Sequence, residues 1–125
     1  MILDTNALSA AADDNPAVIA IVSGENEIAI PVIVLGEYRY GIAQSRHRSR
    51  YSNWLDMLVL DCLVLNVSEE TTHHYAAINL ELRQIGKPIP TNDLWIAALC
   101  RHYSLPILSN DRHFDFVPGN RRIGW

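Results

Sequence analysis

Four acidic residues stand where this sequence is otherwise apolar, and their type and spacing could support chemistry. Asp4 ends the run ILD, and Asp111 follows shortly after the run LPIL. Glu37 interrupts an apolar stripe in a helical pattern, and Asp93 stands near the start of the nearly all-apolar segment PTNDLWIAALC. Because burying a carboxylate without a partner costs free energy, acids in such places need an explanation.

Four carboxylates that meet in one place would repel one another. Two unit charges about 5 Å apart, at an effective dielectric constant near 20, repel by roughly 3 kcal/mol, so the group would take up protons or bind cations. Ligation by oxygen alone favours Mg²⁺ or Mn²⁺ over zinc. Two such ions about 3.5 to 4 Å apart can activate a water and stabilise the leaving oxygen in phosphodiester hydrolysis.

The four acids would divide the work of such a site. We expect Asp4 and Asp93 to hold the ions and Asp111 to complete the coordination. Glu37 is expected to bind an ion or to orient the attacking water.

Polar residues next to these acids are candidates for hydrogen bonds that orient the carboxylates. They are Asn6, Asn92 and Ser109. His113 lies two positions after Asp111, and we interpret it as a structural partner of that acid. It is not needed as a base, because a divalent cation can activate water without a histidine.

The chain alternates strand-like and helical segments. Short apolar runs typical of strands lie at residues 2–4, 27–30, 63–67, 105–108 and 121–125. Helical patterns lie at residues 17–22, 32–43, 51–60, 68–85 and 91–100. Such alternation predicts right-handed crossovers and an α/β fold, with a mainly parallel central sheet and helices on both faces. Ligands bind beyond the carboxyl ends of the strands in such sheets, and there the four acids can converge.

The position of Asp93 has two interpretations. With Thr91 as the N-cap, one stripe of the helix holds Asp93, Ile96, Ala97 and Cys100. Asp93 would then lie at the start of a buried face, which indicates a functional site. An aspartate in a first helical turn also complements the helix dipole, typically by 0.3 to 1 kcal/mol, and needs no further function.

Four segments of the chain resemble the motifs of a known family. They are LDTN at 3–6, the glutamate of GEYRYG at 36–41, GKPIPTNDLWIAA at 86–98 and LSNDRHF at 108–114. Together they are similar to the four acidic motifs of PIN-domain ribonucleases, especially the VapC-like toxins of type II toxin–antitoxin systems. The similarity extends over the whole chain, and it favours the site interpretation of Asp93.

The resemblance implies a PIN-like fold in a single domain, residues 1–125, and endonuclease activity on RNA that depends on Mg²⁺ or Mn²⁺. It also implies a homodimer and a cognate VapB-like antitoxin whose peptide occupies the acidic groove. The catalytic and metal-binding residues that it assigns are Asp4, Glu37, Asp93 and Asp111.

The composition limits the number of domains, the location of the protein and the state of its cysteines. With 125 residues and 49% hydrophobic content, the chain suits one domain with a real core. We expect no signal peptide and no spanning segment, and a cytoplasmic location. Cys62 and Cys100 are isolated among apolar residues, which suits reduced thiols better than a disulfide or a zinc site.

The net charge of −4 by itself argues against a nucleic-acid partner. The distribution matters more, because ten basic residues face 14 acids, and removing the four site acids would leave ten against ten. One acid-free stretch, YRYGIAQSRHRSRY, carries Arg39, Arg46, Arg48 and Arg50 among tyrosines. Arginine suits phosphate and tyrosine suits base stacking in single-stranded RNA, but a solvated face or a dimer surface would have the same composition.

Two other functional interpretations stay open. A PIN-like module could bind a partner without catalysis, although the acid set is intact. A phospho-acceptor receiver domain is also a parallel α/β protein of this length, but it needs paired acids after the first strand and a lysine at a later strand end. Asp4 stands alone after its strand, and the only lysine, Lys87, is expected in a loop between helices.

Overall fold

A five-stranded sheet forms the centre of the protein. The computed structural model describes every residue from Met1 to Trp125. The strands are β1 (Ile2–Leu3), β2 (Ala29–Pro31), β3 (Leu63–Leu65), β4 (Ile107–Leu108) and β5 (Arg122–Ile123). They follow the order β3-β2-β1-β4-β5, and every neighbouring pair is parallel. The predicted α/β class is confirmed.

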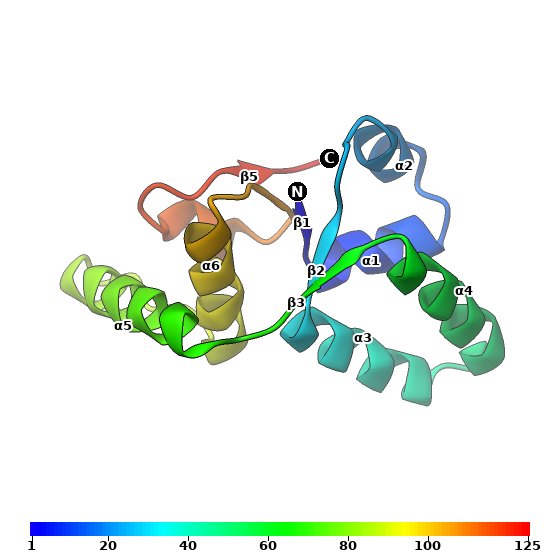
Figure 1. Ribbon diagram of the computed structural model, residues 1–125, viewed down its shortest axis with the longest axis horizontal. Coiled ribbons are helices and arrows are strands. Elements are labelled where there is room, and N and C mark those ends of the chain that lie inside the picture. The colour runs from blue at the N-terminus through cyan, green and yellow to red at the C-terminus, as the bar shows by residue number, and fades with distance from the viewer.

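Six α-helices surround the sheet. They are α1 (Thr5–Ala12), α2 (Pro16–Ser23), α3 (Val32–Gln44), α4 (Arg48–Leu60), α5 (Glu69–Gln84) and α6 (Thr91–Tyr103). A short 3₁₀ helix, η1 (Arg112–Phe116), follows β4. Figure 1 shows α5 and α6 on one side of strands β1 to β3 and α1 to α4 on the other. None of the helices combines the length and the apolar character needed to cross a membrane.

The strand order brings together two strands that are distant in the sequence. β1 lies between β2 and β4, and Leu3 is opposite Leu108. Both residues are completely or almost completely buried, as expected for a parallel sheet covered on both faces. The order of strands along the chain reverses between β1 and β4, and at such a switch point open α/β sheets bind their ligands. Asp4 and Ser109, the next residues of these two strands, lie at this point.

The helix that carries Asp93 is fixed by its apolar face. Ile96, Ala97 and Cys100 of α6 are buried, as the stripe predicts. α6 precedes β4 in a parallel sheet and runs opposite to it, so its first turn lies at the carboxyl edge of the strands. Burial raises the pKa of the Cys100 thiol to about 12, and both cysteines are free.

Some element boundaries differ from the sequence prediction. No helix is predicted before residue 17, yet α1 begins at Thr5, because the Asp4 side chain caps it by accepting a hydrogen bond from Thr5 N (2.8 Å). The predicted N-cap of α6 is wrong, since Thr91 is already helical. Pro90 holds the cap position, and its carbonyl accepts the first helical hydrogen bond, from Leu94 N (3.0 Å). The fourth helix begins at Arg48 instead of residue 51.

The residue that ends α6, Ser104, has an unusual backbone conformation that can be tested by substitution. Ser104 caps the helix with a left-handed φ of 54°, and Leu105 N donates to Cys100 O at 3.0 Å across the turn. Glycine adopts this conformation without the strain that a side chain brings. We expect Ser104→Gly to raise the free energy of unfolding by about 0.5 to 1 kcal/mol, measured by urea denaturation.

A matched control is Ser23→Gly, which makes the same change at an exposed residue in the last turn of α2. Its backbone is right-handed, so the added flexibility should destabilise the protein by about 0.5 to 1 kcal/mol. Equal effects of the two substitutions would contradict the assigned geometry of Ser104.

Candidate metal and active site

Asp4 lies at the centre of the site. Its side chain is 5% exposed and accepts three hydrogen bonds, from Thr5 N (2.8 Å), Asn6 Nδ2 (2.7 Å) and Ser109 Oγ (2.6 Å). Burial raises the pKa of this carboxyl above its usual value, while the bonds from Ser109 and Thr5 lower it. Asp4 is therefore held in one orientation by segments that follow both β1 and β4.

Glu37 approaches from the second turn of α3, the helix that follows β2. Its Oε1 accepts a hydrogen bond from Thr5 Oγ1 at 3.0 Å. Its other oxygen, Oε2, forms no hydrogen bond within the protein. The sequence does not predict a role for Thr5, which follows Asp4 as the first residue of α1 and links that helix to α3 through this hydrogen bond.

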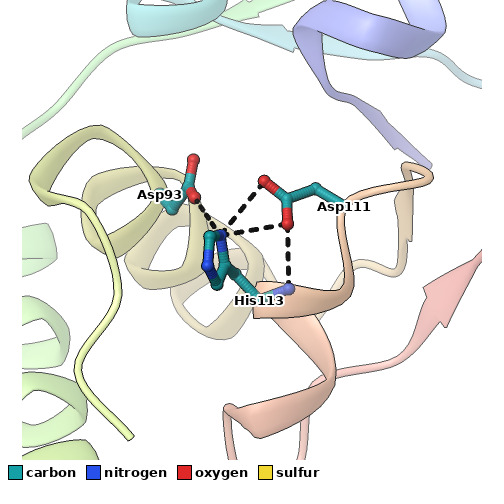
Figure 2. Close-up of side chains that lie close together, drawn as sticks. All are labelled: Asp93, Asp111 and His113. Atoms are coloured by element: carbon teal, nitrogen blue, oxygen red, sulfur yellow. Dashed lines mark hydrogen bonds and ion pairs between the residues drawn. The ribbon is translucent and has the colours of Figure 1, made fainter.

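Asp93 and Asp111 meet at a histidine. Figure 2 shows His113 Nδ1 between them, 3.3 Å from Asp93 Oδ2 and 3.0 Å from Asp111 Oδ1. Asp111 also caps η1, since its Oδ1 accepts a hydrogen bond from His113 N at 2.9 Å. The contact of His113 with Asp111 agrees with the sequence interpretation, whereas the contact with Asp93 was not anticipated, because it depends on how α6 packs beside η1.

The electrostatics show that the four acids act on one another. Burial, followed by the negative charges of Asp111 and Asp4, raises the pKa of Asp93 to about 6. His113 opposes this shift, and Glu37 adds to it. No lysine or arginine forms an ion pair with any of the four carboxylates. The site therefore has an excess of negative charge that its own side chains do not neutralise.

The predicted supporting residues fall into two groups. Asn6 and Ser109 both contact Asp4, and they also contact each other, with Asn6 Nδ2 3.2 Å from Ser109 Oγ. Asn6 Oδ1 accepts a hydrogen bond from Asn110 N (3.0 Å), which fixes the loop after β4. Asn92 is exposed and forms no hydrogen bond with the acids.

A cavity leads away from the acids. It has a volume of about 270 Å³, lies between α1, α3 and α4, and reaches from Thr5 and Glu37 to Ser45 and Tyr51. A larger cavity of about 440 Å³ lies at the opposite end of α6, around Ser104, and includes none of the four acids. Of these two cavities, only the smaller reaches one of the four acids, Glu37, and joins it to the turn between α3 and α4.

The four predicted RNA-contacting arginines lie at that turn and beside it. All are exposed: Arg39, Arg46, Arg48 and Arg50. Their contacts are weak, since Arg39 is 3.8 Å from Asp56 and Arg48 donates to Ala43 O at 3.5 Å. These guanidinium groups are thus available to an external anion.

The donor set fits a hard divalent cation. Asp93, Asp111 and His113 each offer a ligating atom, and these atoms lie within 4.8 Å of one another. Burial, with a further contribution from the neighbouring acids, raises the pKa of Asp93 and of Asp4, so their charged forms are unfavourable there without a counterion. A divalent cation would supply this counterion and match the preference of carboxylates for Mg²⁺ or Mn²⁺.

Comparison with known proteins decides the family. The family model of the PIN domain matches residues 1–120. The chain belongs to the PIN domain family. Ribonuclease VapC2 of Rickettsia felis is 30% identical to it, over 98% of this chain and 96% of that protein. The resemblance of the four acidic motifs is thereby confirmed at the level of the family.

Solved structures share the fold of this PIN domain along its whole length. VapBC2 from Rickettsia felis, bound to a DNA fragment from their promoter, gives a TM-score of 0.86 at 27% identity, covering 99% of this chain and 97% of that chain. DNA-bound VapBC from Salmonella typhimurium gives a TM-score of 0.87 at 25% identity, covering 99% and 96%. The PIN-like fold predicted from the motifs is confirmed.

The free-energy cost of a charged Asp93 in the PIN-domain site should appear in the stability of the protein. The folded-state pKa of Asp93, about 6, exceeds the value of about 3.9 in an unfolded chain, so the native state binds more protons between these values. Stability must then fall as the pH rises from about 4 through about 6. We expect Asp93→Asn, in chelator, to be more stable than the wild type by about 1 to 3 kcal/mol near pH 8 and nearly equal near pH 4.

Asp115→Asn is a control with the opposite sign. Hydrogen bonds from Arg122 lower the pKa of Asp115, so removing this carboxylate should destabilise the protein near neutral pH. Urea denaturation of the three proteins across this pH range measures both effects. An Asp93→Asn protein that is less stable than the wild type near pH 8 would show that the site does not disfavour the charged form of Asp93.

Proposed function

We propose that this protein is a divalent-metal-dependent endoribonuclease that hydrolyses RNA phosphodiester bonds and acts as the toxin of a toxin–antitoxin pair. The observation that carries the proposal is the convergence of four carboxylates, without a lysine or arginine partner, at the switch point of the sheet. The similarity to Ribonuclease VapC2, over nearly all of both chains, supports RNA as the substrate.

Asp4, Asp93 and Asp111 are the residues that would hold the cation. When bound, Mg²⁺ or Mn²⁺ stabilises charge on the phosphate and favours ionisation of the attacking water. Asp4 is prepared for this role, because three hydrogen bonds leave its carboxylate little freedom to turn. Such preorganisation avoids rearrangement of the ligands during the reaction.

Glu37 has the geometry of a residue that orients the attacking water. Thr5 fixes its Oε1, and its free Oε2 can accept a hydrogen bond from a water near the other acids. A water held in this way keeps a lone pair directed at the phosphate, which lowers the entropic cost of the attack.

RNA would reach the acids along the cavity between α1, α3 and α4. The exposed arginines at the α3–α4 turn can contact phosphates, and Tyr51, which lines the cavity, lies beside the Arg50 guanidinium, 5.3 Å from the ring centre. Arginine and tyrosine together are typical of sites for single-stranded nucleic acid.

The proposed partners follow from the same similarity. The two solved relatives are VapBC assemblies, so we expect a VapB-like antitoxin for this chain, and we also expect it to form a homodimer. A short reading frame directly upstream of the gene would identify the antitoxin.

The receiver-domain alternative is disfavoured by the topology. Receiver domains follow the flavodoxin-like strand order 2-1-3-4-5, whereas this sheet has the order β3-β2-β1-β4-β5. Lys87 also lies in the loop between α5 and α6, at no strand end. A non-catalytic PIN-like module remains the second candidate, and a cleavage experiment separates the two.

Cleavage of RNA should require the metal and the acids. We expect Mg²⁺ or Mn²⁺ to support cleavage, excess chelator to stop it, and Asp4→Asn or Asp93→Asn to lower the rate by about 100-fold or more, since metal ligation contributes several kcal/mol to the barrier. Gel analysis of an RNA substrate measures this. Glu25→Gln, which alters an exposed acid after α2, is the control. Undiminished cleavage in excess chelator would refute metal dependence.

The arginine turn should contribute to RNA affinity through phosphate contacts. In an Asp4→Asn background, which prevents cleavage, changing Arg46 and Arg48 to Ala should reduce the slope of log affinity against log salt by about 0.7 per lost contact. Fluorescence anisotropy with a single-stranded RNA measures the slope. Arg83→Ala, at an exposed site on α5, is the control. An unchanged slope combined with loss of dimerisation would assign the turn to a subunit interface.

A further inference from the structure

One side chain of the site carries a nitrogen where the four-acid scheme has only oxygens. His113 Nδ1 points between two acids from different elements, α6 and the loop after β4 (Figure 2). It lies 3.3 Å from Asp93 Oδ2, and 3.0 and 3.3 Å from the two oxygens of Asp111. The same nitrogen therefore faces both carboxylates at once.

These distances match the edges of a coordination polyhedron. With metal–ligand distances of about 2.1 Å in octahedral geometry, adjacent ligand atoms are about 3.0 Å apart. The ring is held near this position, because His113 N is bonded to Asp111 Oδ1 at 2.9 Å and Phe116 packs against the ring edge at a centroid distance of 6.3 Å. Little movement is needed for Nδ1 and the two acids to share one cation.

We propose that His113 Nδ1 is a direct ligand of the divalent cation, together with Asp93 and Asp111. The inference rests on the proposed metal-dependent function and adds a nitrogen donor to its site. Imidazole favours transition-metal ions, whereas Mg²⁺ prefers oxygen. This chain therefore binds Mn²⁺ more tightly than Mg²⁺, by a margin that depends on His113.

The same distances also fit a cationic imidazolium that neutralises the acids while no metal is bound. The two roles predict opposite effects of removing the ring nitrogen. If His113 is a ligand, its loss weakens binding of the cation. If it is a counterion that the metal displaces, its loss leaves a more negative site and strengthens binding of the cation.

The experiment measures metal binding without RNA or turnover. Mn²⁺ and Mg²⁺ affinities are determined by calorimetry, and pulsed electron paramagnetic resonance on the Mn²⁺ complex detects hyperfine coupling to a ligand nitrogen. The proteins are the wild type, His113→Phe, His113→Asn and His73→Asn. His73 is an exposed histidine of α5 far along the chain, and it controls for adventitious binding to surface imidazoles.

We expect nitrogen coupling in the wild type and in His73→Asn, and none in either His113 variant. His113→Phe should bind Mn²⁺ about 10-fold or more weakly, and the Mg²⁺ affinity should fall less. His113→Asn places an amide oxygen near the position of Nδ1, so it should keep more Mg²⁺ affinity than His113→Phe while losing the preference for Mn²⁺. The half-exposed position of His113 makes both changes compatible with folding.

The possible failures are distinguishable. Wild-type protein that binds Mn²⁺ without nitrogen coupling overturns the ligand role and leaves the proposed function intact. Tighter Mn²⁺ binding by His113→Phe assigns the histidine as a counterion and likewise overturns the inference. If the wild type binds neither Mn²⁺ nor Mg²⁺, the proposed metal-dependent function fails, and this inference fails with it.

Discussion

The hydrogen bonds around Asp4 join segments that are about one hundred positions apart in the sequence. Asp4 ends β1, caps α1 and accepts a hydrogen bond from Ser109 at the end of β4, while Asn6 bonds to both. This network works only in the observed register, with Leu3 opposite Leu108. A shift by one residue would turn these side chains to the other face of the sheet. The pairing that completes the sheet is therefore also the pairing that assembles the site.

The fold brings four carboxylates together, and helix dipoles offset only part of the free-energy cost of their negative charges. Asp4 is the N-cap of α1 and Asp93 lies in the first turn of α6, so both face the positive end of a helix dipole. The two interpretations of Asp93 are thus compatible, since one position serves the dipole and the site. The dipoles do not suffice, because the pKa of Asp93 still rises to about 6. Clusters of charge that lower the stability of the native state are typical of functional sites, where activity is favoured over stability.

The sequence was sufficient for the elements whose patterns are local. Apolar runs marked all five strands, and helical patterns marked five of the six α-helices. α1 was missed because its first residues, Thr5 and Asn6, favour turns until Asp4 caps them. The contact between His113 and Asp93 was missed for a different reason. It joins η1 to α6, and the residue spacing within either segment does not predict the angle at which the two segments pack.

Charge links the metal site to the proposed RNA surface. The formal net charge is −4, and four acids of the site account for this excess, so the protein without cations repels a phosphate backbone near the place where it must be cut. Each divalent cation offsets two of these charges and leaves the arginines of the α3–α4 turn to dominate the local field. The cavity joins the turn to Glu37, so under the proposed function RNA binding and cation binding would favour each other through the same electrostatic interaction. Metal availability would then control the affinity for RNA as well as the rate of cleavage.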